Sequence, residues 1–179
     1  IRLITTTIQR MYNAKYHENN EELDDELFQQ FVNDTKIFTD YRRNEKYSSI
    51  DYSATDIKGR RCAVELKRRN FPHTKYGTIL IECEKVWVMI NKYEQFGFIP
   101  LYLNFFNNDT LLIFDLRKIE RPDRDLIYNK ITIMNRGYEE KQRVWRVELP
   151  TEIATLYKKI DGKWTWVKTE DKDIITKNN

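Results

Sequence analysis

The twenty residues from Ile50 to Arg69 restrict the fold more than any other stretch of the chain. They read as two strands joined by a tight turn. Residues 57–59 form a three-residue loop, and Gly59 takes the position that needs a positive φ. Asp56 would then face Arg60 across the turn. The sequence therefore predicts a β-hairpin whose register can be counted from its turn.

This register brings three charged side chains onto one face of the hairpin. Counting back along both arms puts Asp51 opposite Glu65, with Cβ atoms about 4.5–5.5 Å apart, where two like charges destabilise a sheet. Lys67 follows two residues after Glu65 and points to the same face. Two carboxylates and a lysine in this arrangement are typical of a metal site with a cation beside it. We interpret them as a centre for phosphodiester hydrolysis.

The opposite face of the hairpin is apolar. We expect a helix to pack on this face, because it offers a continuous hydrophobic surface. Its predicted members are Ile50, Tyr52, Ala54, Cys62, Val64 and Leu66.

Helices are predicted on both sides of the hairpin. The first begins at Asn19, which forms a capping box with Glu22, and an apolar stripe follows. Asp24 falls inside this stripe. Two interpretations are open: Asp24 lies in solvent on a frayed first turn, or it is an additional acid directed at the site.

The second helix is predicted from Thr78 to Gln95. Glu82 lies at the edge of its apolar arc, and Lys85 lies one turn further along. Either the two form an exposed i, i+3 pair, or they are auxiliary members of the site.

The rest of the chain reads mainly as strands. Strand pairs are predicted at 98–106 with 110–116, at 130–135 with 142–149, and at 154–160 with 163–168, the last around an Asp-Gly turn. Helices mixed with hairpins predict an α+β or α/β fold with a mixed central sheet. We expect a single domain over residues 1–179, with a core at 19–116 and a β-rich C-terminal extension at 130–168.

Composition narrows the classes of partner. The 179 residues are 40% hydrophobic and 33% charged, and only five glycines and four prolines are present, which argues against a disordered chain. The net charge is +3 and the pI about 8.7. Arginines concentrate in the central part, which favours a polyanionic partner. The predicted nucleic-acid-binding residues are Arg42, Arg43, Arg60, Arg61, Arg68 and Arg69.

Several other chemistries are disfavoured. Two histidines without a Cys or His cluster argue against zinc. Neither a Gly-rich phosphate loop nor a Ser nucleophile elbow is present in the sequence. No apolar run approaches membrane-spanning length, so we expect no membrane partner. Cys62 and Cys83 lie in apolar segments and are predicted to be buried free thiols, as in a reducing, cytoplasmic compartment.

The chemistry suits a hard divalent cation. Hydrolysis of a phosphodiester needs an activated water and neutralisation of the charge that develops, and such a cation supplies both. Mg²⁺ prefers oxygen ligands, so Asp51, Glu65 and the backbone carbonyl of Leu66 are the candidate metal ligands. Lys67 would hold the attacking water.

These residues resemble the PD-(D/E)XK nuclease superfamily, which has the restriction-endonuclease-like fold. The matching residues are Asp51 and the run Glu65-Leu66-Lys67, with thirteen residues between Asp51 and Glu65. Ile50 departs from the family pattern, because a proline often precedes the acid. The resemblance covers about residues 19–116. It implies Mg²⁺ or Mn²⁺ as cofactor and DNA as partner.

The expected activity is that of a metal-dependent DNA nuclease, in the first place an endonuclease. An exonuclease is the other option, and the kind of DNA that is cut stays open. The modest size favours a homodimer, which would cut both strands. The alternative is a catalytically retired protein of the same fold that binds nucleic acid or acts in an assembly. Exposed aromatic side chains would serve such a protein as contact surfaces.

Overall fold

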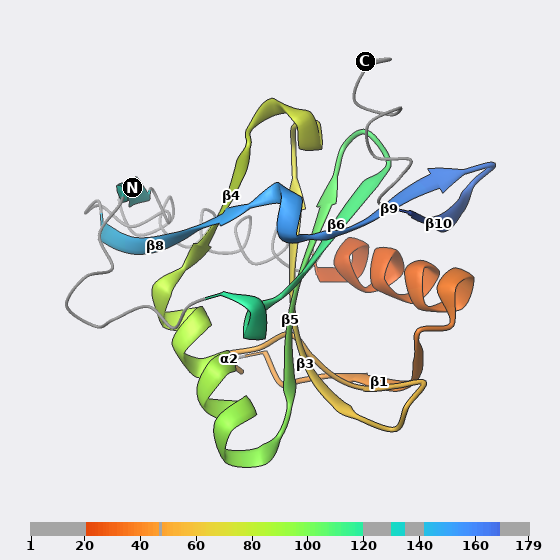
Figure 1. Ribbon diagram of the computed structural model, residues 1–179, viewed down its shortest axis with the longest axis horizontal. Coiled ribbons are helices and arrows are strands. Elements are labelled where there is room, and N and C mark those ends of the chain that lie inside the picture. Colours follow the sequence, from red (N-terminus) through yellow and green to blue (C-terminus); the bar gives the residue numbers. More distant parts are fainter. Residues whose placement is uncertain (1–20, 47, 120–129, 135–141, 169–179) are drawn as a thin grey trace, which may run out of the picture.

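The computed structural model describes residues 21–46, 48–119, 130–134 and 142–168. Its central feature is a seven-stranded sheet with the order β1-β2-β3-β5-β6-β9-β10 (Figure 1). β3 and β5 are parallel, whereas the other neighbours in this sheet are antiparallel. The predicted mixed sheet is thus confirmed. Its strands are β1 Phe38–Arg43, β2 Tyr52–Asp56, β3 Arg61–Arg69, β5 Ile99–Phe106, β6 Thr110–Asp115, β9 Thr155–Ile160 and β10 Lys163–Val167.

The predicted register of the hairpin is confirmed. Tyr52 pairs with Val64, which is the same register that would place Asp51 opposite Glu65. Gly59 has φ +74°, as the turn requires. The turn closes where the Asp56 N–H donates to the carbonyl of Arg60 at 2.9 Å.

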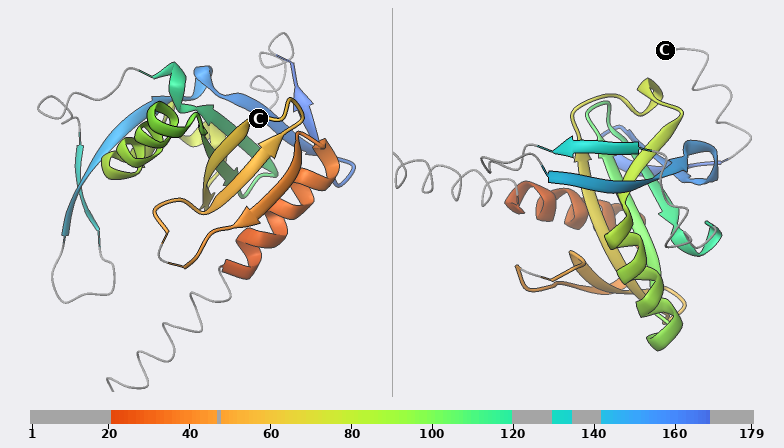
Figure 2. Two further views of the ribbon diagram at one scale, coloured as in Figure 1. Left: turned by 90° about the horizontal axis from the view of Figure 1, so that it is seen from below. Right: turned by 90° about the vertical axis from the view of Figure 1, so that its left-hand side faces the viewer.

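Two helices cover opposite faces of this sheet (Figure 2). The N-terminal helix (residues 21–35) buries Phe28 and Phe31 completely against the face that carries Tyr52 and Val64. Each of these phenylalanines contributes about 1.5–3 kcal/mol by its burial. The predicted helix on the apolar face is therefore present. Its predicted start at Asn19 lies outside the described residues.

The other helix, α2 (Cys83–Phe96), packs on the face that carries the predicted site. Val86 and Met89 are fully buried there beside Ala63. Ile50 belongs to this second cluster, so its predicted place on the opposite face was wrong. The strand alternation does not reach Ile50, because Asp51 lies in a bend before β2 begins.

The predicted helix from Thr78 to Gln95 was wrong in its first five residues. They form the strand β4 (Thr78–Glu82), and the helix begins only at Cys83. Ile79 and Ile81 are buried while their neighbours are half-exposed, which is the period of a strand. The partner strand, β8 (Gln142–Pro150), lies more than sixty residues further along the chain, so the local pattern could not reveal it.

β4, β8 and β7 (Lys130–Met134) form a separate three-stranded sheet. The predicted pairing of β7 with β8 and of β9 with β10 is confirmed. β9 also pairs with β6, so the last two strands extend the central sheet. Short 3-10 helices span His73–Lys75, Leu116–Lys118 and Thr151–Ile153.

Both cysteines are free and buried, as predicted. Within the described part of the chain, the helices are too short or too polar to cross a membrane.

Candidate active site

Asp51 is held at the point where the two hairpin strands separate. The β2–β3 pairing ends at Tyr52 and Val64. Beyond it, the Asp51 carboxylate takes the place of a strand partner: its Oδ2 accepts a hydrogen bond from the N–H of Leu66 at 2.8 Å. The Asp51 carbonyl accepts from the N–H of Asn44 at 2.8 Å, which fixes the backbone on the other side.

The carbonyl of Leu66 points to the same open edge. In a strand, the N–H and C=O of one residue are directed to the same neighbouring strand. Because the Leu66 N–H reaches Asp51, the Leu66 carbonyl lies on the Asp51 side of β3. Its proposed role as a metal ligand is compatible with this direction.

Glu65 is a buried acid in an unfavourable electrostatic environment. Its side chain is 12% exposed. Burial, and after it the charge of Asp51, raise the pKa of Glu65 to about 7, although Lys85 and Lys67 act in the opposite direction. The two carboxylates predicted to face each other therefore interact electrostatically.

Lys85 projects from α2 onto both oxygens of Glu65. Its Nζ lies 2.8 Å from Oε1 and 3.0 Å from Oε2 of Glu65, and it also donates to the carbonyl of Ser49 at 3.0 Å. Lys85 thus contacts a predicted metal ligand, and its auxiliary role in the site stays a prediction. Glu82 lies at the end of β4, in the N-cap position of α2, and not on the face of a helix.

A groove of about 720 Å³ opens over these residues. Lys67 is exposed in it, on the same strand as Glu65. Side chains from the N-terminal helix form the opposite wall. The charged residues around its centre are Asp24, Asp51, Glu65, Lys67, Arg68 and Arg69.

Asp24 does not lie in open solvent on a frayed turn. Its side chain is 29% exposed and forms an ion pair with Arg68. The pKa of Asp24 is raised above its ordinary value, and burial is the largest cause. The ion pair with Arg68 lowers this pKa in part, whereas the charge of Asp51 raises it. Asp24 thus lies close enough to Asp51 to interact with it, in the same groove.

A second groove of about 610 Å³ reaches the site from the side of α2. Glu65, Lys67 and Arg69 line both grooves, whereas Glu82 and Lys85 line only the second. β3 therefore lies between the two grooves, and its two predicted catalytic residues, Glu65 and Lys67, line both of them.

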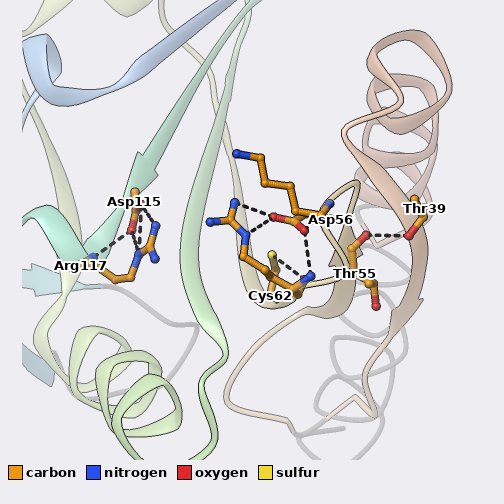
Figure 3. A network of polar contacts seen from close by, with 8 residues as sticks. Thr39, Thr55, Asp56, Cys62, Asp115 and Arg117 are labelled. Carbon is orange, nitrogen blue, oxygen red and sulfur yellow. Dashed lines mark hydrogen bonds and ion pairs between the residues drawn. The ribbon is translucent and has the colours of Figure 1, made fainter.

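The six predicted nucleic-acid-binding arginines are divided between two places. Arg60 and Arg61 lie at the turn, about 14–17 Å of strand away from Glu65. There Arg60 pairs with Asp56 at 2.7 Å (Figure 3), and Arg61 donates to the carbonyl of Phe96. Both are thus bound within the protein at the far end of the hairpin.

The other four lie nearer to the site. Arg42 is exposed on β1, and Arg43 forms an ion pair with Asp25 of the N-terminal helix. Arg68 pairs with Asp24, as described above. Arg69 is engaged in a network inside the fold, described below. A role of these residues in binding nucleic acid stays a prediction.

The donor set suits a hard cation. In the described part of the chain, no three His, Cys, Asp or Glu side chains together form a group that could hold a metal ion. Asp51 and Glu65 instead provide two carboxylates, and the Leu66 carbonyl is directed to the same edge. Oxygen ligands in this small number suit Mg²⁺, which retains several of its waters.

No protein-family model matches the chain, and no curated protein matches its sequence. Among solved structures, the chain is similar to Hjc, a Holliday junction resolvase from the archaeal hyperthermophile Archaeoglobus fulgidus. The identity is 12%, the match covers 69% of this chain and 79% of that chain, and the TM-score is 0.44. A likeness of this extent assigns no role to any residue of this chain.

Sequence reasoning missed a buried polar network beside the predicted catalytic residues. The guanidinium of Arg69 donates to Asn104 Oδ1 at 2.9 Å, to the Tyr102 hydroxyl at 2.7 Å and to the Leu80 carbonyl at 2.9 Å. Tyr102 and Asn104 are the register partners of Glu65 and Lys67 on β5. The alternation of polar with apolar residues in β5 was a usable signal, but only the parallel pairing shows that they adjoin β3.

Proposed function

We propose that the protein is a metal-dependent DNA nuclease that hydrolyses phosphodiester bonds, most simply as an endonuclease. One observation carries this proposal: Asp51 and Glu65 meet around Leu66 at the open end of the hairpin, in a groove where Lys67 is exposed. Two interacting acids beside an exposed lysine are costly to keep in a fold, and hydrolysis of a phosphodiester uses this combination.

In this proposal, Asp51, Glu65 and the Leu66 carbonyl hold Mg²⁺ or Mn²⁺. When bound, the ion supplies charge neutralisation and acidifies water. The Leu66 N–H orients the Asp51 carboxylate, and Lys85 orients that of Glu65. Lys67 holds the attacking water through its Nζ and neutralises negative charge that develops on the phosphate oxygens. Side chains of the N-terminal helix line the same groove.

The fold supports this assignment of roles. β3 is a central strand, paired with β2 on one side and β5 on the other, so Glu65 and Lys67 are carried on a rigid element. The Arg69 network ties the end of β3 to β5 and β4. Asp51, by contrast, lies on the connecting segment, and its hydrogen bond to Leu66 substitutes for strand pairing.

The test is cleavage of circular, linear and branched DNA in Mg²⁺, Mn²⁺ or EDTA. We expect cleavage in either metal, none in EDTA, and a loss of at least about 100-fold in Lys67→Ala. The matched control is Lys58→Ala, an exposed lysine at the turn of the same hairpin, which should cleave like the parent protein.

Cleavage that survives Glu65→Ala would exclude this mechanism. Binding of DNA without cleavage in either metal would instead support the alternative, a protein of this fold that has lost its activity. Size-exclusion chromatography with light scattering would show whether the active species is the expected homodimer.

A further inference from the structure

The loop that follows β3 presents aromatic and basic side chains at one end of the first groove. β3 ends at Arg69, and Lys67, Arg69 and the following Asn70 line the groove. The chain then forms what we call the aromatic loop, residues 70–77, before β4 begins. Inside it the rings of Phe71 and Tyr76 meet edge to face, with centroids 5.2 Å apart.

The aromatic loop is held near its middle and at its C-terminal end. His73 is tied to Asn108 by contacts of 3.4 Å from its N–H and 3.0 Å from its Nδ1. The Gly77 carbonyl accepts from the N–H and the hydroxyl of Thr151, at 3.0 and 3.1 Å. The loop therefore lies beside the β5–β6 turn, at the same end of the central sheet (Figure 1). A surface that is already ordered binds a ligand at a lower entropic cost.

Tyr76 is the exposed part of this loop. Half of its surface is accessible, although large apolar side chains are usually covered. The Nζ of Lys75 lies 5.3 Å from the ring centroid of Tyr76 and 5.6 Å from that of Phe71. An accessible ring next to a cation is the combination that binds a nucleotide, since the ring stacks on the base and the cation attracts the phosphate.

The loop contacts a residue that lines the groove. Phe71 packs on Phe106, with centroids 5.9 Å apart, and Phe106 lines the groove together with Asn70 and Asn107. Lys158 adds a further positive charge near His73. Burial lowers the pKa of His73, the hydrogen bond with Asn108 raises it, and the charge of Lys158 lowers it. A DNA strand that lies over Glu65 and Lys67 would meet this surface next.

We propose that the aromatic loop binds an unpaired nucleotide, with the base stacked on Tyr76 and the phosphate near Lys75. The preferred substrate is then DNA in which a duplex adjoins a single-stranded tail or branch, because the bases inside a duplex already stack on one another. This inference rests on the proposed function, since it places DNA in the first groove.

The experiment measures binding in EDTA, so that cleavage does not interfere. Fluorescence anisotropy compares a blunt duplex with the same duplex carrying a single-stranded tail that contains 2-aminopurine. We expect the tailed DNA to bind more tightly. Tyr76→Ala should weaken binding of the tailed DNA about 5- to 100-fold and leave the blunt duplex unchanged. Tyr76→Phe should retain both the affinity and the quenching of 2-aminopurine.

Tyr93→Ala is the matched control, because Tyr93 is a partly exposed tyrosine on α2 whose ring faces Arg117 instead. It should bind tailed DNA like the parent protein. Equal binding of tailed DNA by Tyr76→Ala and the parent would overturn the inference, as would equal losses in Tyr76→Ala and Tyr76→Phe. A different result would overturn the proposed function alone: the tailed DNA binds through Tyr76, but Mg²⁺-dependent cleavage is absent.

Discussion

The two ends of the β2–β3 hairpin each carry a buried acid, and their environments are opposite. At the turn, Asp56 accepts from the N–H groups of Lys58 and Arg60, both at 2.9 Å, and from Arg60 Nε at 2.7 Å. Burial alone would raise the pKa of Asp56, but these bonds outweigh it and hold the pKa below its usual value. At the open end, burial and Asp51 raise the pKa of Glu65 to about 7.

The difference separates an acid whose charge its own turn stabilises from an acid whose charge its surroundings disfavour. The hydrogen bonds of Asp56 come from within four residues, so the turn stabilises its own charge. At Glu65, the charges of Lys85 and Lys67 do not outweigh burial and the neighbouring acid, and the ion pair comes from Lys85 on a different element. A site of this kind reduces the stability of the fold, and such costs concentrate where a protein binds or reacts.

The largest effect on cleavage is expected for Glu65→Gln. Cleavage should fall by at least about 1,000-fold, because a neutral amide replaces a ligand carboxylate. In EDTA at pH 8, however, the variant should be more stable than the parent by up to about 3 kcal/mol, which corresponds to a rise of pKa from 4.5 to about 7.

The sign of this effect depends on pH. A raised folded-state pKa favours the protonated acid, so the parent protein is penalised only as pH rises above 4.5, and fully above about 7. Urea unfolding at pH 4.5 should therefore show little difference between Glu65→Gln and the parent. Glu84→Gln, an exposed acid on α2, is the control. A destabilised Glu65→Gln at pH 8 would contradict the comparison.

Asp56→Ala, in contrast to Glu65→Gln, should make the protein less stable. We expect a loss of about 1–3 kcal/mol in the free energy of unfolding at pH 7, because two backbone N–H groups and Arg60 lose their acceptor. Since the folded-state pKa is lowered, the contribution of Asp56 should also disappear as pH falls through that pKa. Cleavage per folded molecule should not change, and a selective loss of cleavage would show that the turn takes part in the reaction.

Lys85→Met should change metal binding. In the parent, the ammonium group contacts both oxygens of Glu65, and a divalent ion at the same carboxylate is repelled by it. We expect the affinity for Mn²⁺, measured by isothermal titration calorimetry without DNA, to rise about tenfold. Lys92→Met, two turns further along α2, should bind like the parent. Weaker binding in Lys85→Met would mean that Lys85 orients Glu65 more than it competes with the ion.

The smallest effects on DNA binding are expected from basic residues near the two ends of the β2–β3 hairpin. Lys46→Gln, at the groove, should lower the affinity for DNA about threefold and reduce its dependence on salt. Arg60→Gln should change the affinity by less than about twofold, because Arg60 lies at the turn and is paired with Asp56. Anisotropy titrations at two salt concentrations would measure both, and equal losses would place DNA along the whole hairpin.

The sequence by itself determined the local parts of this protein. The turn at Gly59, the register of β2 with β3 and the later hairpins follow from the period of two and from turn residues, which act over a few positions. This was sufficient to bring Asp51, Glu65 and Lys67 together in advance. Asp24 was also identified, but its two interpretations could not be separated without its partner Arg68.

Only the tertiary structure decided what surrounds these residues. Thr78–Glu82 is a strand because β8 pairs with it, and the apolar pattern of five residues fits a helix as well. The raised pKa of Glu65 and its contact with Lys85 depend on residues that are 20 positions apart in the sequence. The bond of Arg69 to Asn104 joins residues that are 35 positions apart. Burial and charge act through space, so no count along the chain could supply them.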